Sequence, residues 1–299
     1  MTHAYKFDEM YNRVVLRCAS IRRVTSSSKK KSSDKKKVSR NSQGQDNTNR
    51  KTRILCLHGY EQSKESFRKK TGALRRAGKS HVAEFVFLDA PHESLPRDDS
   101  NSSEGKAWYL PAISKDKKSS STFFEDDSQG ASSGGSRSWN LPLDESTWTC
   151  SLAHIGKCFK EQGPFDGILG FSQGAATTAA LCRLQLEDSK DPYLSSIKFQ
   201  FAIMISGFIP SHGLYIGDSK LDETTILNGK FDTLHIFGSS DEIINPKRSK
   251  ALMNYFAESD TREMVHECMH IEHNGGHLVP SDKHVRDAFK EFLGRRRKK

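Results

Sequence analysis

Residues 170–174, Gly-Phe-Ser-Gln-Gly, constrain the fold of this chain more than any other segment. They follow the apolar, strand-like segment 165–169 and precede a run of small residues, 175–181, that favours a helix. A serine between glycines at such a junction predicts a sharp turn that exposes the hydroxyl, because glycine has no Cβ to crowd the neighbouring backbone. The pattern therefore predicts a nucleophilic serine, Ser172, at the end of a strand.

A serine in this setting needs a base to take its proton and an acid to orient the base. In α/β-hydrolases the acid and then the histidine follow the serine along the chain. Asp241 lies in the short loop after the strand-like segment 231–238, and His277 follows the turn-forming residues Gly275 and Gly276. This order predicts that Asp241 orients His277 and that His277 activates the serine.

Two other carboxylates compete with Asp241 for the role of the acid. Asp232 stands at the start of the same strand-like segment, which would place it at the opposite edge of the sheet. Glu242 lies in the same loop as Asp241 and has a longer side chain. Asp241 is the preferred acid, and Glu242 stays open as an alternative.

Acyl transfer to a serine also needs two N–H groups that bind the developing negative oxygen. The backbone N–H of Gln173, directly after the serine, is the first predicted donor. The loop after the strand-like segment 53–57 is expected to supply the second, from Tyr60 or, alternatively, from Glu61. His58 is predicted to be structural, because only one histidine can serve the serine.

Several stretches of the chain resemble the FSH family of serine hydrolases. They are residues 55–59, 67–75, 89–92, 163–176, 205–208, 238–241 and 275–277. The resemblance covers about residues 53–293 and implies hydrolysis of carboxylic esters or thioesters. It also implies that Ser172, Asp241 and His277 form a catalytic triad. No cofactor is expected.

Apolar, strand-like segments alternate with helix-like segments along most of the chain. The strand-like segments lie around residues 54, 85, 168, 203, 234 and 265. This alternation predicts an α/β-hydrolase fold with a doubly wound, mainly parallel sheet and flanking helices.

The chain is only 34% hydrophobic, which is low for a fully packed domain of 299 residues. Residues 25–49 and 114–138 are rich in Ser, Lys, Asn, Gln and Gly and cannot bury enough apolar area to offset the entropy of ordering. We therefore expect a basic, disordered extension at 1–50 and a hydrolase domain at 51–294. A low-complexity insertion at about 112–138 and a basic tail at 295–299 complete the predicted organisation.

The positive charge is concentrated at the two ends of the chain. Residues 1–50 carry thirteen Lys and Arg residues against four acidic residues, and residues 295–299 carry five more basic residues. Since the whole chain has a net charge of +10, the remaining residues carry −4. We expect no specific nucleic-acid site in the folded part, no transmembrane segment, and a cytoplasmic or nuclear location.

Residues 266–270 spell His-Glu-Cys-Met-His, the zinc-protease pattern. That pattern binds zinc only on a helix, where residues four apart share a face. The run 264–271 alternates apolar residues and ends at glycines, so it predicts a strand, on which the two histidines would lie roughly 13 Å apart. No metal site is predicted.

Four residues are predicted to form apolar walls for an acyl chain: Trp108, Tyr109, Phe208 and Ile244. Core packing is an equal alternative for the first two. A site for a polar acyl group should place Arg or Lys there in place of these apolar side chains. The predicted partner is thus a small acyl ester or thioester. The competing hypothesis is a non-catalytic acyl-ligand carrier or scaffold on the same fold.

Overall fold

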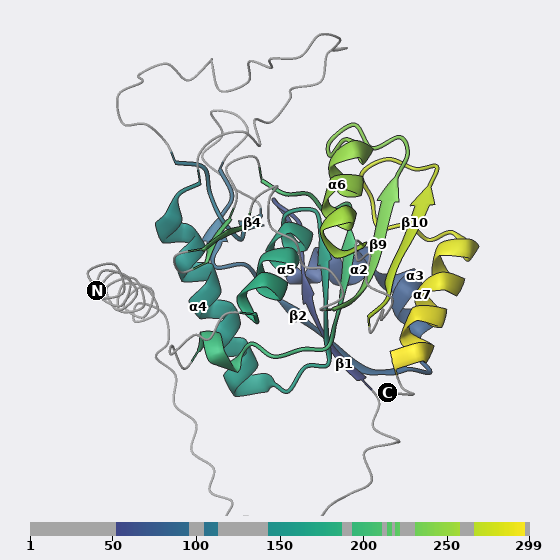
Figure 1. Cartoon of the computed structure of the whole chain (residues 1–299), viewed down its shortest axis with the longest axis horizontal. Coiled ribbons are helices and arrows are strands. Elements are labelled where there is room, and N and C mark those ends of the chain that lie inside the picture. The colour runs from purple at the N-terminus through teal and green to yellow at the C-terminus, as the bar shows by residue number, and fades with distance from the viewer. Residues whose placement is uncertain are drawn as a thin grey trace, which may run out of the picture.

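Six parallel strands form the central sheet of the computed structural model (Figure 1), in the order β10-β9-β6-β5-β1-β2. They are β1 (Thr52–Leu57), β2 (Val82–Leu88), β5 (Gly167–Phe171), β6 (Phe201–Ile205), β9 (Asp232–Gly238) and β10 (Cys268–His273). Two short antiparallel pairs, β3 (His92–Glu93) with β4 (Lys106–Ala107) and β7 (Leu214–Ile216) with β8 (Ser219–Leu221), lie outside this sheet.

The structure describes residues 52–95, 105–112, 143–186, 193–210, 214–216, 219–221, 231–257 and 266–296. The predicted extension at 1–50, nearly all of the predicted insertion at 112–138, and residues 297–299 of the predicted tail lie outside this part of the chain. In the described part, no helix combines the length and the apolar character needed to cross a membrane.

Helices cover both faces of the sheet (Figure 1), which confirms the predicted doubly wound, mainly parallel architecture. One face carries α4 (Glu145–Gln162), α5 (Gln173–Leu184) and α6 (Pro246–Ala257), and the short helix η3 (Leu194–Ser196) packs against α4. The other face carries α2 (Lys64–Lys70), α3 (Gly72–Gly78) and α7 (Lys283–Arg296).

Each strand divides its side chains between two hydrophobic cores. In β1, Leu55 and Leu57 pack into the core under α4, α5 and α6, whereas Ile54 and Cys56 pack into the core under α2, α3 and α7. Successive side chains of a strand point to opposite faces, so a strand that is covered on both sides is apolar throughout. This explains why the inner strands β5 and β6 read as continuous apolar runs in the sequence.

The last strand starts later than predicted. The run 264–271 was expected to be a strand, but β10 spans Cys268–His273. Before the strand begins, Glu267 pairs through its side chain with Arg295 and Arg296 of α7, and its carbonyl accepts a hydrogen bond from the Thr233 N–H at 2.8 Å. Residues 264 and 265 of the predicted run lie outside the described part of the chain.

The order of the strands fixes where a ligand can bind. From β1 the chain moves outward to β2, then returns to the other side of β1 at β5 and continues through β6, β9 and β10. In open parallel sheets the ligand crevice lies beyond the carboxyl ends of the strands at the point where the order reverses. Here that point lies between β1 and β5, where the segment containing Ser172 begins.

Candidate active site

Ser172 occupies a strained turn between β5 and α5. Its φ is 52° and its ψ is −117°, a conformation that side chains other than glycine rarely adopt. The turn requires glycine on both sides of it. A Cβ at Gly170 would overlap the carbonyl of Gly174, and a Cβ at Gly174 would overlap the carbonyl of Leu57. Strain of this kind persists only where the surrounding structure enforces it, and it is concentrated at functional sites.

His277 joins Ser172 to Asp241. Its Nδ1 lies 2.8 Å from Asp241 Oδ2, and its Nε2 lies 3.0 Å from Ser172 Oγ. A carboxylate only accepts hydrogen bonds, so Nδ1 carries the proton and Nε2 accepts from the serine hydroxyl. The structure thus brings together the three side chains that the sequence placed in a nucleophile, base and acid series.

The Asp241 carboxylate is held by the backbone of its own loop. Its Oδ1 accepts hydrogen bonds from the N–H groups of Ile243 at 3.0 Å and Ile244 at 2.8 Å, which leaves Oδ2 for His277. These two bonds fix the orientation of the carboxylate. The group can therefore orient the imidazole and stabilise its positive charge.

The competing carboxylates lie elsewhere. Asp232 is the first residue of β9, and the seven-residue strand separates it from the Asp241 loop by roughly 20 Å. Glu242 is exposed to solvent. Neither one is the hydrogen-bond partner of His277.

The loops after β9 and β10 touch, and this contact sets the acid beside the base. A Cβ at Gly238 would overlap the carbonyl of Gly275, and the Ser240 N–H donates to that carbonyl at 3.3 Å. The ring of His277 also packs against Phe171, with 4.9 Å between ring centres. Glycine at 238 is therefore required for the close approach of the two loops.

The first turn of α5 offers N–H groups beside the serine. Gln173 is the first residue of this helix, and the leading N–H groups of a helix have no intrahelical acceptor. The Gln173 side chain is fixed on both sides: its Oε1 accepts from the Trp108 N–H at 2.8 Å, and its Nε2 donates to the Tyr109 carbonyl at 2.9 Å. This side-chain clamp, which the sequence did not indicate, fixes the start of the helix.

The loop after β1 passes directly beside Ser172, the candidate nucleophile. A Cβ on Gly59 would lie 3.2 Å from the Cβ of Ser172. The Glu61 N–H is already bonded to the Lys106 carbonyl at 3.0 Å, which removes the alternative oxyanion donor that the sequence left open. Tyr60 follows Gly59 directly, and its phenol oxygen accepts a hydrogen bond from the Leu95 N–H at 3.0 Å.

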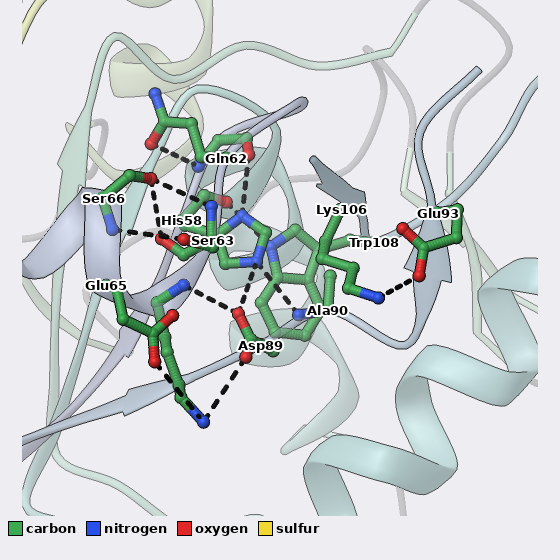
Figure 2. A network of polar contacts seen from close by, with 12 residues as sticks. His58, Gln62, Ser63, Glu65, Ser66, Asp89, Ala90, Glu93, Lys106 and Trp108 are labelled. Atoms are coloured by element: carbon green, nitrogen blue, oxygen red, sulfur yellow. Dashed lines mark hydrogen bonds and ion pairs between the residues drawn. The ribbon is translucent and has the colours of Figure 1, made fainter. Parts of the chain in front are cut away.

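His58 is buried in a separate network (Figure 2). Its Nδ1 donates to the Gly59 carbonyl at 2.7 Å, and its Nε2 accepts from the Ala90 N–H at 3.0 Å. The Trp108 indole donates to the His58 carbonyl at 2.8 Å. Burial lowers the pKa of His58, so the ring stays neutral. Both of its nitrogens are engaged, and the ring joins the loops after β1 and β2.

The four residues predicted to be acyl walls are all buried. Trp108 and Tyr109 belong to the core under α4, α5 and α6, whereas Phe208 and Ile244 form a small cluster with Ala176. Ala176 lies one helical turn after Ser172, so this cluster lies next to the nucleophile.

The zinc-protease pattern does not lie on a helix. His266 precedes β10, and His270 lies within that strand. In the described residues, no group of three or more His, Cys, Asp or Glu side chains is arranged to hold a metal ion.

Comparisons with known proteins agree with this geometry. Residues 48–289 match the family model described as "Serine hydrolase (FSH1)". Esterase OVCA2 of Danio rerio is 32% identical over 243 residues, which cover 81% of this chain and 96% of that protein. Rhodanese-like domain-containing protein 6 of Arabidopsis thaliana is 35% identical over 259 residues, covering 83% of this chain but only 40% of that longer protein.

Among solved structures, SOBER1 of Arabidopsis thaliana superposes with a TM-score of 0.51 at 17% identity, covering 83% of this chain and 99% of SOBER1. At this level of identity the similarity speaks for the fold alone. It confirms the predicted α/β-hydrolase fold.

Proposed function

Since the chain belongs to the FSH1 family of serine hydrolases and is an esterase, we propose that it cleaves esters or thioesters of apolar acyl chains, with Ser172 as the nucleophile. The observation that carries this proposal is the unbroken series of hydrogen bonds from Ser172 Oγ through His277 to Asp241, at 3.0 and 2.8 Å.

In the proposed mechanism, Ser172 Oγ attacks the acyl carbon while His277 Nε2 takes its proton. The oxygen of the tetrahedral intermediate becomes negative and is bound by the N–H groups of Gln173 and Tyr60. The imidazolium, stabilised by Asp241, then gives its proton to the leaving oxygen or sulfur, and an acyl-enzyme forms. Water repeats the two steps and releases the acid, which restores the serine.

The surface near the site supports an apolar substrate. Leu186, Ile243 and Leu278 are the large hydrophobic side chains exposed within the described part of the chain. Ile243 is two residues from Asp241 and 49% exposed, and Leu278 directly follows His277 and is 44% exposed. Each methylene that leaves water contributes about 0.8 kcal/mol, so an apolar rim favours longer acyl chains.

A fluorophosphonate probe, which reacts with activated serines, tests the nucleophile. It should label the wild type and fail to label Ser172→Ala. The matched control is Ser206→Ala, which changes a buried serine that also has positive φ, 47°, and lies at the end of the neighbouring strand β6. This control should label normally. Equal labelling of both variants would refute the assignment, and no labelling of the wild type would favour the non-catalytic carrier.

The acyl preference is tested with a series of 4-nitrophenyl esters. The value of kcat/KM should rise from acetate to hexanoate, because each added methylene is withdrawn from water in the bound state. A profile that peaks at acetate and falls with each added carbon would reject the apolar acyl site while leaving the nucleophile untouched.

A further inference from the structure

Arg248 is a cation withdrawn from water beside the candidate site. It lies in the first turns of α6, with its guanidinium carbon 4.8 Å above the centre of the Phe208 ring and its Nη2 donating to the Ile209 carbonyl at 3.1 Å. Within the described ranges, no carboxylate pairs with it, and burial lowers its pKa. A partly buried guanidinium that has a single carbonyl acceptor retains several unused N–H donors.

Tyr109 is the second polar group at this place. Its side chain is only 7% exposed, and its hydroxyl has no hydrogen-bond partner among the described residues. Burial raises the pKa of Tyr109, so the phenol keeps its proton and can donate it. The positive charge of Arg248 opposes this rise in the pKa of Tyr109, so the guanidinium acts electrostatically on the phenol. A buried hydroxyl without a partner calls for an explanation, and a ligand can supply one.

Both groups connect to the candidate catalytic residues through apolar side chains and short bonded links. Phe208, under the Arg248 guanidinium, packs with Ile244 and Ala176, and the Ile244 N–H donates to Asp241. On the other side, the Tyr109 carbonyl is bonded to the side chain of Gln173, the residue after the nucleophile. Ala176, Phe208 and the Arg248 guanidinium thus form a continuous series of contacts that starts in the helical turn after Ser172.

We propose that Arg248 and Tyr109 bind a carboxylate at the far end of the acyl chain, so that the preferred substrates are half esters or half thioesters of medium-chain dicarboxylic acids. The guanidinium would donate two parallel hydrogen bonds to the carboxylate and the phenol a third. This inference rests on the proposed function, since it names the substrate class of the same site.

The experiment compares two substrates of the full-length enzyme. One is the 4-nitrophenyl half ester of adipic acid, which carries a free carboxylate, and the other is 4-nitrophenyl heptanoate, a neutral chain of similar length. The ratio of their kcat/KM values isolates the carboxylate, because the reacting ester is the same. In Arg248→Met this ratio should fall about tenfold to a hundredfold, as expected for the loss of a hydrogen-bonded charge. In Tyr109→Phe it should fall less.

Lys250→Met is the matched control. Lys250 lies on the same helix two residues further on, is exposed, and pairs with Glu272 at 3.0 Å, so this change removes the same charge without touching the cluster. It should leave the ratio unchanged. Arg248→Lys keeps the charge but not the paired donors and should give an intermediate ratio. This conservative variant also keeps the test valid if Arg248→Met folds poorly.

A ratio that is the same in the wild type and in both Arg248 variants would overturn the proposal. So would an equal fall in Lys250→Met, which would mean that a general field attracts the anion. A third substrate, the heptanoate ester of 4-hydroxybenzoate, carries its carboxylate on the alcohol half. If Arg248→Met lowers kcat/KM for this substrate instead of for the adipate half ester, the assignment of Arg248 to the acyl half is wrong. Hydrolysis of neutral heptanoate by the wild type tests the proposed function separately from all of these outcomes.

Discussion

The two ends of strand β9 carry the same pair of residue types and use them differently. At the carboxyl end Asp241 bonds His277 at 2.8 Å, and at the amino end Asp232 lies 3.6 Å from His266. Asp241 is oriented by two backbone N–H groups and faces a histidine that reaches a serine. Asp232 pairs instead with the buried guanidinium of Arg296 and accepts a hydrogen bond from the Glu267 N–H at 2.8 Å.

The comparison shows that the neighbours of an Asp–His pair decide what the pair can do. A carboxylate held by a guanidinium has its charge neutralised, and it ties β9 to α7. A carboxylate held by N–H groups keeps its charge available for an imidazolium. The amino end is accordingly expected to serve stability, and the carboxyl end is proposed to serve catalysis.

Exchanging each aspartate for asparagine should separate these roles, and the largest effect is expected at the carboxyl end. Asp241→Asn removes the acceptor that fixes the His277 tautomer, so kcat for 4-nitrophenyl hexanoate should fall by about 10⁴ with little change in the unfolding midpoint. Steady-state kinetics and thermal melting measure the two effects. Glu242→Gln, the exposed neighbour, is the control and should keep kcat within about twofold.

Asp232→Asn should show the opposite pattern. Arg296 then keeps Glu267 as a carboxylate partner but loses its charged hydrogen bond to Asp232, which is expected to cost about 1.5–3 kcal/mol of unfolding free energy. The value of kcat, measured well below the melting temperature, should stay near that of the wild type. A loss of kcat in Asp232→Asn as large as that in Asp241→Asn would break the distinction between the two ends.

A smaller effect is expected in the middle of the same strand, at His235. Burial lowers the pKa of His235 from 6.5 to about 3, and its Nε2 has no protein partner among the described residues. Below pH 6.5 the unfolded chain therefore binds a proton that the folded chain does not bind. The free energy of unfolding should fall by about 1.4 kcal/mol per pH unit from this group alone as the pH drops from 6.5 towards 4.

His235→Leu removes this proton and should flatten the dependence. Urea unfolding at pH 7, 6 and 5 gives the slope for the wild type and for the variant, and the difference between them belongs to His235. Two parallel slopes would contradict the buried neutral state of this residue. The kcat of the folded His235→Leu variant should equal that of the wild type at every pH. The reason is that His235 contacts Phe256 of α6 and, within the described residues, no residue of the candidate site.

Much of the site could be anticipated from local sequence. The glycines around Ser172 and the glycine that ends β9 are needed because a Cβ there would overlap backbone. Such positions can be recognised in the sequence because only glycine fits them. The meeting of Ser172, Asp241 and His277 at one edge follows from the parallel sheet, in which every strand delivers its carboxyl end to the same edge. Asp232 was assigned to the opposite edge by the same reasoning.

Other features arise only when distant segments meet. The Glu61 N–H is not available as an oxyanion donor because it donates to the carbonyl of Lys106, forty-five positions later in the chain. The ion pairs of Glu267 with Arg295 and Arg296 of α7 join residues about 28 positions apart, which the local pattern around Glu267 does not indicate. The packing of Arg248 of α6 on Phe208 likewise joins two separate segments.

The sequence by itself therefore determined the sheet, the turn at Ser172 and the order of the candidate catalytic residues. They are encoded by the periodicity of apolar residues and by the positions of glycines, which influence the backbone over only a few residues. The tertiary structure alone decided which N–H groups and charges remain available around the site. Hydrogen bonds and ion pairs depend on atoms within about 3 Å, and only packing brings residues far apart in the chain to that distance.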